Sequence, residues 1–223
     1  MRNIWWILVA VLMSFAVPAQ AADAVPTLAP DDMVLGKPDA PVTIFEYASL
    51  TCPHCAEFET ETLPKVKAEW IETGKAKLVF RDYPLDQVAV KASQLAHCGP
   101  PERFFGFIDE LFHSQRSWVL TNDNTQALAK IGRLGGVSQE KFDACLADKA
   151  LQDKIVNSRF VAANQYGVNS TPTFFVNGTK VVGALAYDDF AKSLSAAYAA
   201  AAPTAPKSEL TGPRFAQAMT TNE

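Results

Sequence analysis

The chain of 223 residues has no apolar stretch of membrane-spanning length after its N-terminal segment, and it has no internal repeat. A transmembrane helix needs about 20 consecutive apolar residues. The sequence also has no stripe of basic residues, and its formal net charge is −4. An acidic chain without a basic surface is poorly suited to bind nucleic acid or anionic lipid, so we expect neither as a partner.

Histidine and cysteine are scarce, with three and four residues respectively. Structural zinc sites use four ligands, usually from two Cys-X-X-Cys clusters or from a cysteine pair and a histidine pair. Here Cys52 and Cys55 form one Cys-X-X-Cys, whereas Cys98 and Cys145 are isolated. Tracts rich in methionine or histidine, which would favour copper, do not occur in the sequence. The sequence therefore favours a redox dithiol without a metal, and a dithiol metal-binding protein is the alternative from a different class.

The first 21 residues have the pattern of a cleavable secretory signal. Arg2 precedes an apolar core over residues 4–17, and residues 19–21 (Ala-Gln-Ala) match a small-X-small cleavage site. The apolar core is shorter than a membrane span, so an uncleaved anchor is the weaker alternative. We expect an exported protein, and in an oxidising compartment an even number of cysteines suggests pairing.

Residues 42–55 carry the strongest chemical signal in the chain. The run Val42–Ala48 is rich in β-branched and aromatic residues, and a helical pattern follows Cys55. This order places Cys52 in the first turn of a helix, where unpaired N–H groups and the helix dipole favour an anion. Because the thiolate is the reactive form of cysteine, Cys52 is the candidate nucleophile and Cys55 its disulfide partner.

Three neighbours of the dithiol are candidate supporting residues. Pro53 rigidifies the turn and has no N–H to donate. A positively charged His54 would stabilise the thiolate and make the disulfide more oxidising, although a passive turn residue is the alternative. Glu46 lies in the middle of the strand before Cys52, where a buried carboxylate needs a partner or a function. It could exchange a proton with Cys55, or it could face solvent.

The hydrophobic periods predict an α/β chain in which a helical block separates two strand-bearing segments. We expect one discontinuous α/β domain over 41–84 and 168–200, with an inserted helical domain over 85–167. Residues 22–40 are expected to be an N-terminal extension, and the Ala-, Pro-, Ser- and Thr-rich residues 201–223 a disordered tail. The strands are predicted over 42–48, 77–83, 173–176 and 179–182. The helices are predicted over 56–73, 86–98, 101–114, 124–134, 138–146, 151–166 and 188–199.

Two further pairs of residues are open to more than one interpretation. Thr171-Pro172 precedes a predicted strand, where proline is often only structural. A cis bond beside a dithiol would instead present the backbone of the preceding residue to an extended peptide. Cys98 and Cys145 remain for each other once Cys52 and Cys55 pair, and two buried free thiols are the alternative.

The strand–Cys-Pro-His-Cys–helix start, the helical insertion and the Thr-Pro-Thr before a hairpin together resemble the thioredoxin superfamily, and specifically its DsbA-like branch. The resemblance covers roughly residues 34–200. It implies a thioredoxin fold with an inserted all-helical domain. By resemblance Cys52 is the nucleophile, Cys55 the buried partner, Glu46 the buried acid and Pro172 a cis-proline. The extra pair of Cys98 and Cys145 resembles an alphaproteobacterial branch with a second, structural disulfide.

The resemblance implies a periplasmic protein disulfide oxidoreductase that acts in oxidative protein folding without a cofactor. Exported proteins with free thiols would receive the disulfide through a mixed disulfide at Cys52, and a DsbB-type membrane oxidase would restore it. Thr171 before Pro172 is also found in disulfide isomerases, so an isomerase or reductase is the alternative within the superfamily. The segment before the first predicted strand is too short for a dimerisation domain, so we expect a monomer. An acid is frequent at the position of Glu59 in this family, and the sequence assigns it no role.

Overall fold

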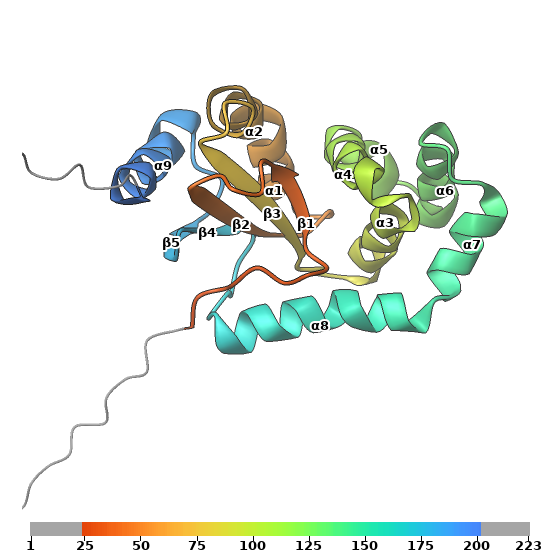
Figure 1. Ribbon diagram of the computed structural model, residues 1–223. Coiled ribbons are helices and arrows are strands. Elements are labelled where there is room, and N and C mark those ends of the chain that lie inside the picture. Colours follow the sequence, from red (N-terminus) through yellow and green to blue (C-terminus); the bar gives the residue numbers. More distant parts are fainter. Residues whose placement is uncertain (1–23, 202–223) are drawn as a thin grey trace, which may run out of the picture.

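The computed structural model describes residues 24–201, so the predicted signal at 1–21 lies outside the described residues, as does the predicted tail at 201–223 except for Ala201, which ends a helix. Its centre is a five-stranded sheet in the order β1-β3-β2-β4-β5 (Figure 1). β2 and β3 run parallel, and the other neighbouring strands are antiparallel. The strands are β1 (Met33–Gly36), β2 (Val42–Ala48), β3 (Ala76–Asp82), β4 (Thr173–Val176) and β5 (Thr179–Val182).

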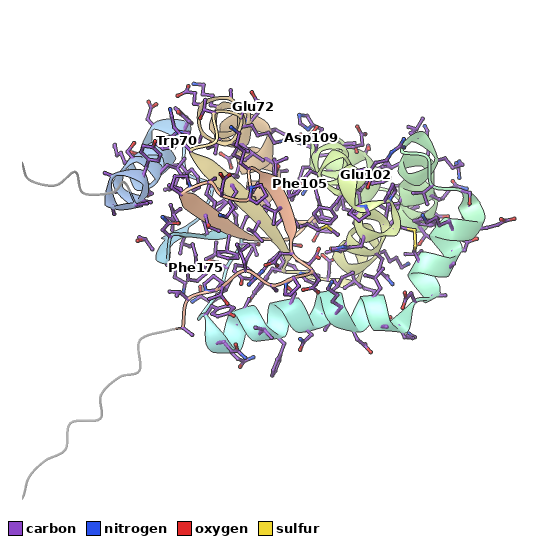
Figure 2. The ribbon with its side chains drawn as sticks, in the orientation of Figure 1. Trp70, Glu72, Glu102, Phe105, Asp109 and Phe175 are labelled. Atoms are coloured by element: carbon purple, nitrogen blue, oxygen red, sulfur yellow. A yellow bond between two sulfur atoms is a disulfide. The ribbon has the colours of Figure 1, made fainter. Side chains whose placement is uncertain are left out.

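Helices cover both faces of the sheet, which is why the central strand β2 is almost entirely buried. On one face Ile44 packs with Phe58, which lies in the helical segment 53–71, and with Phe190 of α9 (Tyr187–Ala201). On the other face Tyr47 and Phe175 pack with residues of α8 (Lys149–Gln165). Figure 1 shows α8 passing across this second face, and Figure 2 shows Phe175 on the same side of the sheet. Because β2 and β3 run parallel, their C-terminal ends lie at the same edge of the sheet, and Cys52 and Cys55 follow β2 at that edge.

Six α-helices stand between β3 and β4, as the predicted helical insertion requires. Four of them begin at side chains that cap the first backbone N–H groups, namely Asp86, Asp123, Ser138 and Asp148. No helix within residues 24–201 is long and apolar enough to cross a membrane. The six helices are α3 (Gln87–Cys98), α4 (Phe104–His113), α5 (Gln115–Val119), α6 (Asn124–Leu134), α7 (Gln139–Ala147) and α8.

Two elements were not predicted from the sequence. Residues 33–36, expected to be part of an aperiodic extension, form the edge strand β1 and pair with β3. Arg81 of β3 fixes the chain just before β1, because its guanidinium bonds Asp32 at 2.7 and 2.9 Å and the Thr27 carbonyl at 2.6 Å. The second difference is α5, a short helix that the prediction of one helix over 101–114 did not include. Both elements are too short for a hydrophobic period to show.

The helix after the Cys-X-X-Cys begins three residues earlier than predicted and is not uniform. It passes from α1 (Pro53–Glu57) through the π-helical η1 (Phe58–Thr62), α2 (Leu63–Val66) and the π-helical η2 (Lys67–Ile71). Pro64, for which the sequence predicts a kink, lies in the first turn of α2, directly after a π-helical turn. Proline lacks the N–H that a regular α-helix needs there, and a π-turn accommodates the missing bond.

Candidate active site

Cys52 is the N-cap residue of α1, with extended backbone angles of φ −79° and ψ 121°. β2 ends at Ala48, and loop 49–52 turns the chain into the helix with a 3.0 Å bond from the Cys52 N–H to the Ser49 carbonyl. The first N–H groups of a helix have no partner within it. Those of His54 and Cys55 bond the Cys52 sulfur instead, so the predicted position at a helix start is present.

The surroundings of Cys52 lower its pKa from 9.0 to about 5. The largest cause is the hydrogen bond that the Cys55 thiol donates to the Cys52 sulfur. Burial acts in the opposite direction, and the Thr171 hydroxyl and the N–H groups of Cys55 and His54 lower the pKa further. Each donor favours the charged form because it bonds the thiolate more strongly than the thiol. Cys52 is therefore a thiolate at neutral pH.

Cys55 has the opposite character. Its side chain is fully buried, and burial raises its pKa well above 9.0. The hydrogen bond to Cys52, the charge of Cys52 and the charge of Glu46 raise it further. The reduced pair therefore carries one negative charge, which resides on the sulfur at the helix N-terminus.

The loop before β4 reaches the dithiol. Because β4 is antiparallel to β2 and Thr173 lies opposite Tyr47, the start of β4 is brought beside the end of β2. The Thr171–Pro172 peptide bond is cis. The Cys52 Sγ lies 3.5 Å from the Thr171 carbonyl oxygen, across 119 residues of sequence. The structure thus brings Thr171 and Pro172 to the cysteine pair that the sequence analysis singled out.

Glu46 is fully buried in β2, and neither of its carboxylate oxygens has a hydrogen-bond donor within the described residues. Glu59 in η1 is 2% exposed, and its Oε1 also has no donor there. The charge of Glu59 raises the pKa of Glu46, so Glu46 is the member of the pair that keeps its proton. Glu59 follows Cys55 by one helical turn, so the spacing of four residues could have identified it.

The pair of acids has a proton available near neutral pH. Burial is the main cause that raises the pKa of Glu46 well above 4.5, and the charge of Glu59 adds to it. Burial likewise raises the pKa of Glu59 to about 7, while the charge of Lys67 lowers it. Since the charge of Glu46 also raises the pKa of Cys55, the acid pair acts on the buried thiol.

A charged pair links this region to the helical insert. Lys67 Nζ in η2 lies 3.2 Å from Asp109 Oδ1 in α4. Figure 2 shows Asp109 and Phe105 on the side of α4 that faces the active-site helix. The two side chains are partly exposed, with 27% and 48% of their surfaces accessible. Lys67, whose charge lowers the pKa of the buried Glu59, thus belongs to an ion pair that is partly exposed to solvent.

Pro53 and His54 are exposed at the first turn of α1. The His54 side chain is 73% exposed, and its Nδ1 lies 3.2 Å from Glu57 Oε2. The structure therefore directs the imidazole towards Glu57, and the contribution of His54 to the Cys52 thiolate comes from its backbone N–H. Proline at the first helical position leaves no donor unused there, because it has none.

Cys98 and Cys145 form a disulfide between α3 and α7, with the Cα atoms 5.9 Å apart and a sequence separation of 47. Cys98 belongs to the hydrophobic cluster that also contains Cys52 and Cys55, and Cys145 packs against it. The pair is separate from the dithiol and has no free thiol. Within residues 24–201 there is no cluster of three or more histidine, cysteine or acidic side chains that could hold a metal.

Comparison with known proteins gives the same family as the fold and the site. The family model for thioredoxin matches residues 28–196. A Rickettsia bellii protein, provisionally named a protein-disulfide oxidoreductase, is 37% identical over 152 residues. This match covers 67% of this chain and 58% of that protein, so the chain spans little more than half of that relative.

Two other relatives are covered more completely. Bacillus cereus has a probable disulfide bond formation protein D that is 30% identical over 152 residues, which are 65% of this chain and 69% of that protein. The crystal structure of Wolbachia pipientis alpha-DsbA1 superposes with a TM-score of 0.74 at 36% identity and covers 78% of this chain and 94% of that chain. The predicted thioredoxin fold with a helical insertion is confirmed, and the chain belongs to the thioredoxin superfamily, in its DsbA-like branch.

Proposed function

We propose that this protein is a periplasmic thiol:disulfide oxidoreductase that donates a disulfide from Cys52–Cys55 to exported proteins. The observation that carries the proposal is the opposite displacement of the two cysteine pKa values, to about 5 for Cys52 and well above 9.0 for Cys55. A stable Cys52 thiolate stabilises the reduced form, which makes the disulfide a strong oxidant and Cys52 a good leaving group. The names of the relatives support the same reaction.

The reaction begins with the oxidised protein. A substrate thiolate attacks the Cys52 sulfur, the Cys52–Cys55 bond breaks, and its electron pair goes to the Cys55 sulfur, which takes up a proton. Glu46, whose pKa burial raises well above 4.5 so that it holds a proton, is the proposed source of that proton. A second substrate thiolate then attacks the substrate sulfur of the mixed disulfide and releases Cys52 as a thiolate. The substrate loses two electrons and gains a disulfide, and the protein is left reduced.

The surroundings of the dithiol suit an extended substrate. Thr171 approaches the Cys52 sulfur through its carbonyl, so a peptide bonded to Cys52 lies beside the Thr171 backbone. A reduced product must be reoxidised, and we propose a membrane oxidase of the DsbB type as the partner. We further propose that the protein acts as a monomer and that the dithiol needs no bound cofactor.

The test is a redox equilibrium with glutathione, combined with oxidation of a reduced, unfolded model protein. We expect the oxidised protein to transfer one disulfide per molecule and to equilibrate as a stronger oxidant than glutathione. Thiolate absorbance of the reduced protein against pH should give a midpoint near 5. A midpoint near that of free cysteine, about 8.5, would contradict the donor role. Faster rearrangement of a scrambled protein than oxidation of a reduced one would favour the isomerase alternative.

A further inference from the structure

Gln115, the first residue of α5, reaches from the helical insert into loop 49–52. Its Nε2 lies 2.8 Å from the Leu50 carbonyl oxygen and 3.0 Å from the Cys52 carbonyl oxygen. Because both partners are acceptors, the NH₂ group of the amide must face the loop and donate both of its hydrogens. The residue is 6% exposed, so water competes little for these bonds.

The support behind Gln115 is rigid. Ser114, with φ −95° and ψ 10°, separates α4 from α5 and changes the direction of the chain just before Gln115. Trp118 is fully buried and donates its Nε1 to the Leu111 carbonyl at 2.8 Å. The side-chain amide of Asn124 donates to the carbonyls at the end of α5, at 2.6 Å for Trp118 and 3.1 Å for Val119. These bonds fix the short helix α5, and with it the position of the Gln115 side chain.

Loop 49–52 has a second connection to the insert, but that connection does not involve Cys52. The Thr51 hydroxyl donates to Asp86, the N-cap of α3, at 2.8 Å. Gln115 differs because it bonds the residue that carries the nucleophile, at a carbonyl that also accepts from Ala56 N in the first turn of α1. The position of that carbonyl determines how the start of α1 is oriented relative to loop 49–52.

We propose that Gln115 is a positioning residue through which the helical insert holds Leu50–Cys52, so that the N–H groups of His54 and Cys55 stay directed at the Cys52 sulfur. The proposal rests on the proposed function, because it concerns the oxidising strength of the same dithiol. Loss of the two bonds lets the loop move relative to α1 and weakens the donors to the thiolate. The positive NH₂ end of the amide is lost as well, and both changes disfavour the thiolate.

The test compares two buried glutamines of the insert. Gln94 in α3 is 2% exposed, and its Nε2 donates to the Cys145 carbonyl at 3.0 Å and to the Leu146 and Asp148 carbonyls at 3.4 Å, all at the end of α7. Gln115→Met and Gln94→Met each replace a buried amide by an apolar side chain of similar length. Each also leaves carbonyl groups with fewer donors, so both variants should lose thermal stability.

We expect Gln115→Met alone to raise the midpoint of the Cys52 thiolate titration. Its equilibrium constant with glutathione should move about threefold to tenfold towards a weaker oxidant, the range for the loss of one hydrogen-bonded contact. Gln94→Met should keep the wild-type values of both quantities. If Gln115→Met does not fold, Gln115→Asn, which keeps an amide but is too short to reach both carbonyls, should move both quantities in the same direction.

The proposal is overturned if the Gln115 variants match the wild type in both quantities, or if Gln94→Met shifts them equally. Failure of the proposed function looks different, because the wild-type protein itself would then titrate near a free cysteine and transfer no disulfide. A substitution that only destabilised the fold would lower the melting temperature without moving the titration midpoint.

Discussion

The two cysteine pairs of this chain differ in what surrounds them. Cys52 and Cys55 lie in one helical turn at the end of a central strand, and their pKa values move in opposite directions. Cys98 and Cys145 join two separate helices of the insert as a disulfide. Both pairs lie in or against the same apolar cluster, but the first pair also has hydrogen-bond donors and a buried acid around its sulfurs. The difference shows that the backbone position of a cysteine, more than its burial, decides whether it is suited to exchange or to cross-linking.

The most severe way to test this contrast is to remove one pair at a time. Cys52→Ala should abolish disulfide transfer to a reduced model protein, because no other described thiol lies at a helix N-terminus. The double variant Cys98→Ala/Cys145→Ala should retain transfer by Cys52. The assay follows substrate thiols with an alkylating reagent, and equal loss of transfer in the two variants would contradict the division of roles.

The pH dependence of stability sharpens the contrast, because only one pair titrates. The folded pKa of Cys52 is about 5 against 9.0 when unperturbed, so its contribution to stability is complete above pH 9 and is lost as pH falls towards 5. The reduced protein should therefore lose stability relative to the oxidised protein over this range, by on the order of 5 kcal/mol. Urea unfolding of both forms at several pH values measures the difference.

Two other groups do not disturb this comparison. The pKa of Cys55 is raised above 9.0, so this thiol stays protonated throughout the range. Glu46 and Glu59 titrate in both redox forms, and their contributions largely cancel in the difference. The variant without Cys98 and Cys145 should show the same pH slope, and a flat difference would refute the low pKa of Cys52.

Removal of the Cys98–Cys145 disulfide should lower the free energy of unfolding without changing the Cys52 titration. The bond closes a loop with a sequence separation of 47. A loop of this length predicts about 4 kcal/mol in the chain-entropy model. Chemical denaturation of the double alanine variant measures the loss, and a changed thiolate midpoint would show that the two pairs are coupled.

The smallest expected effect concerns the proton held by the two buried acids. Glu59→Gln removes a charge that raises the pKa of Glu46, so Glu46 should hold its proton less firmly and proton transfer to Cys55 should slow by up to about tenfold at neutral pH. Glu61→Gln is the matched control, because Glu61 lies in the same η1 segment but is exposed. Stopped-flow mixing of the oxidised protein with a small thiol measures the rate, and equal rates in both variants would exclude a role for Glu59.

Much of the site could be predicted because its signals are local in sequence. A Cys-X-X-Cys between a strand and a helix places Cys52 at a helix start before any tertiary structure is known. Glu46 stands out because an acid interrupts an apolar strand. Thr171 and Pro172 were assigned by resemblance, since nothing near them in sequence indicates a dithiol.

What the sequence did not predict depends on packing between distant segments. Gln115 is a polar residue after a predicted helix, and only the fold shows that it reaches Cys52 across 63 residues. The approach of Asp109 to Lys67 depends on where the insert docks. The exposed imidazole of His54 illustrates the reverse case, in which a local signal was clear but the rotamer directs the ring to Glu57.

Cys52 and Thr171 are 119 positions apart in sequence, which has a consequence for a chain that is synthesised from its N-terminus. Cys52 emerges long before β4 is available to pair with β2, and the whole insert must follow before the loop at Pro172 can close over the sulfur. The unfinished chain therefore carries a Cys52 thiol that still lacks the Thr171 hydroxyl, one of the donors that lower its pKa in the folded protein.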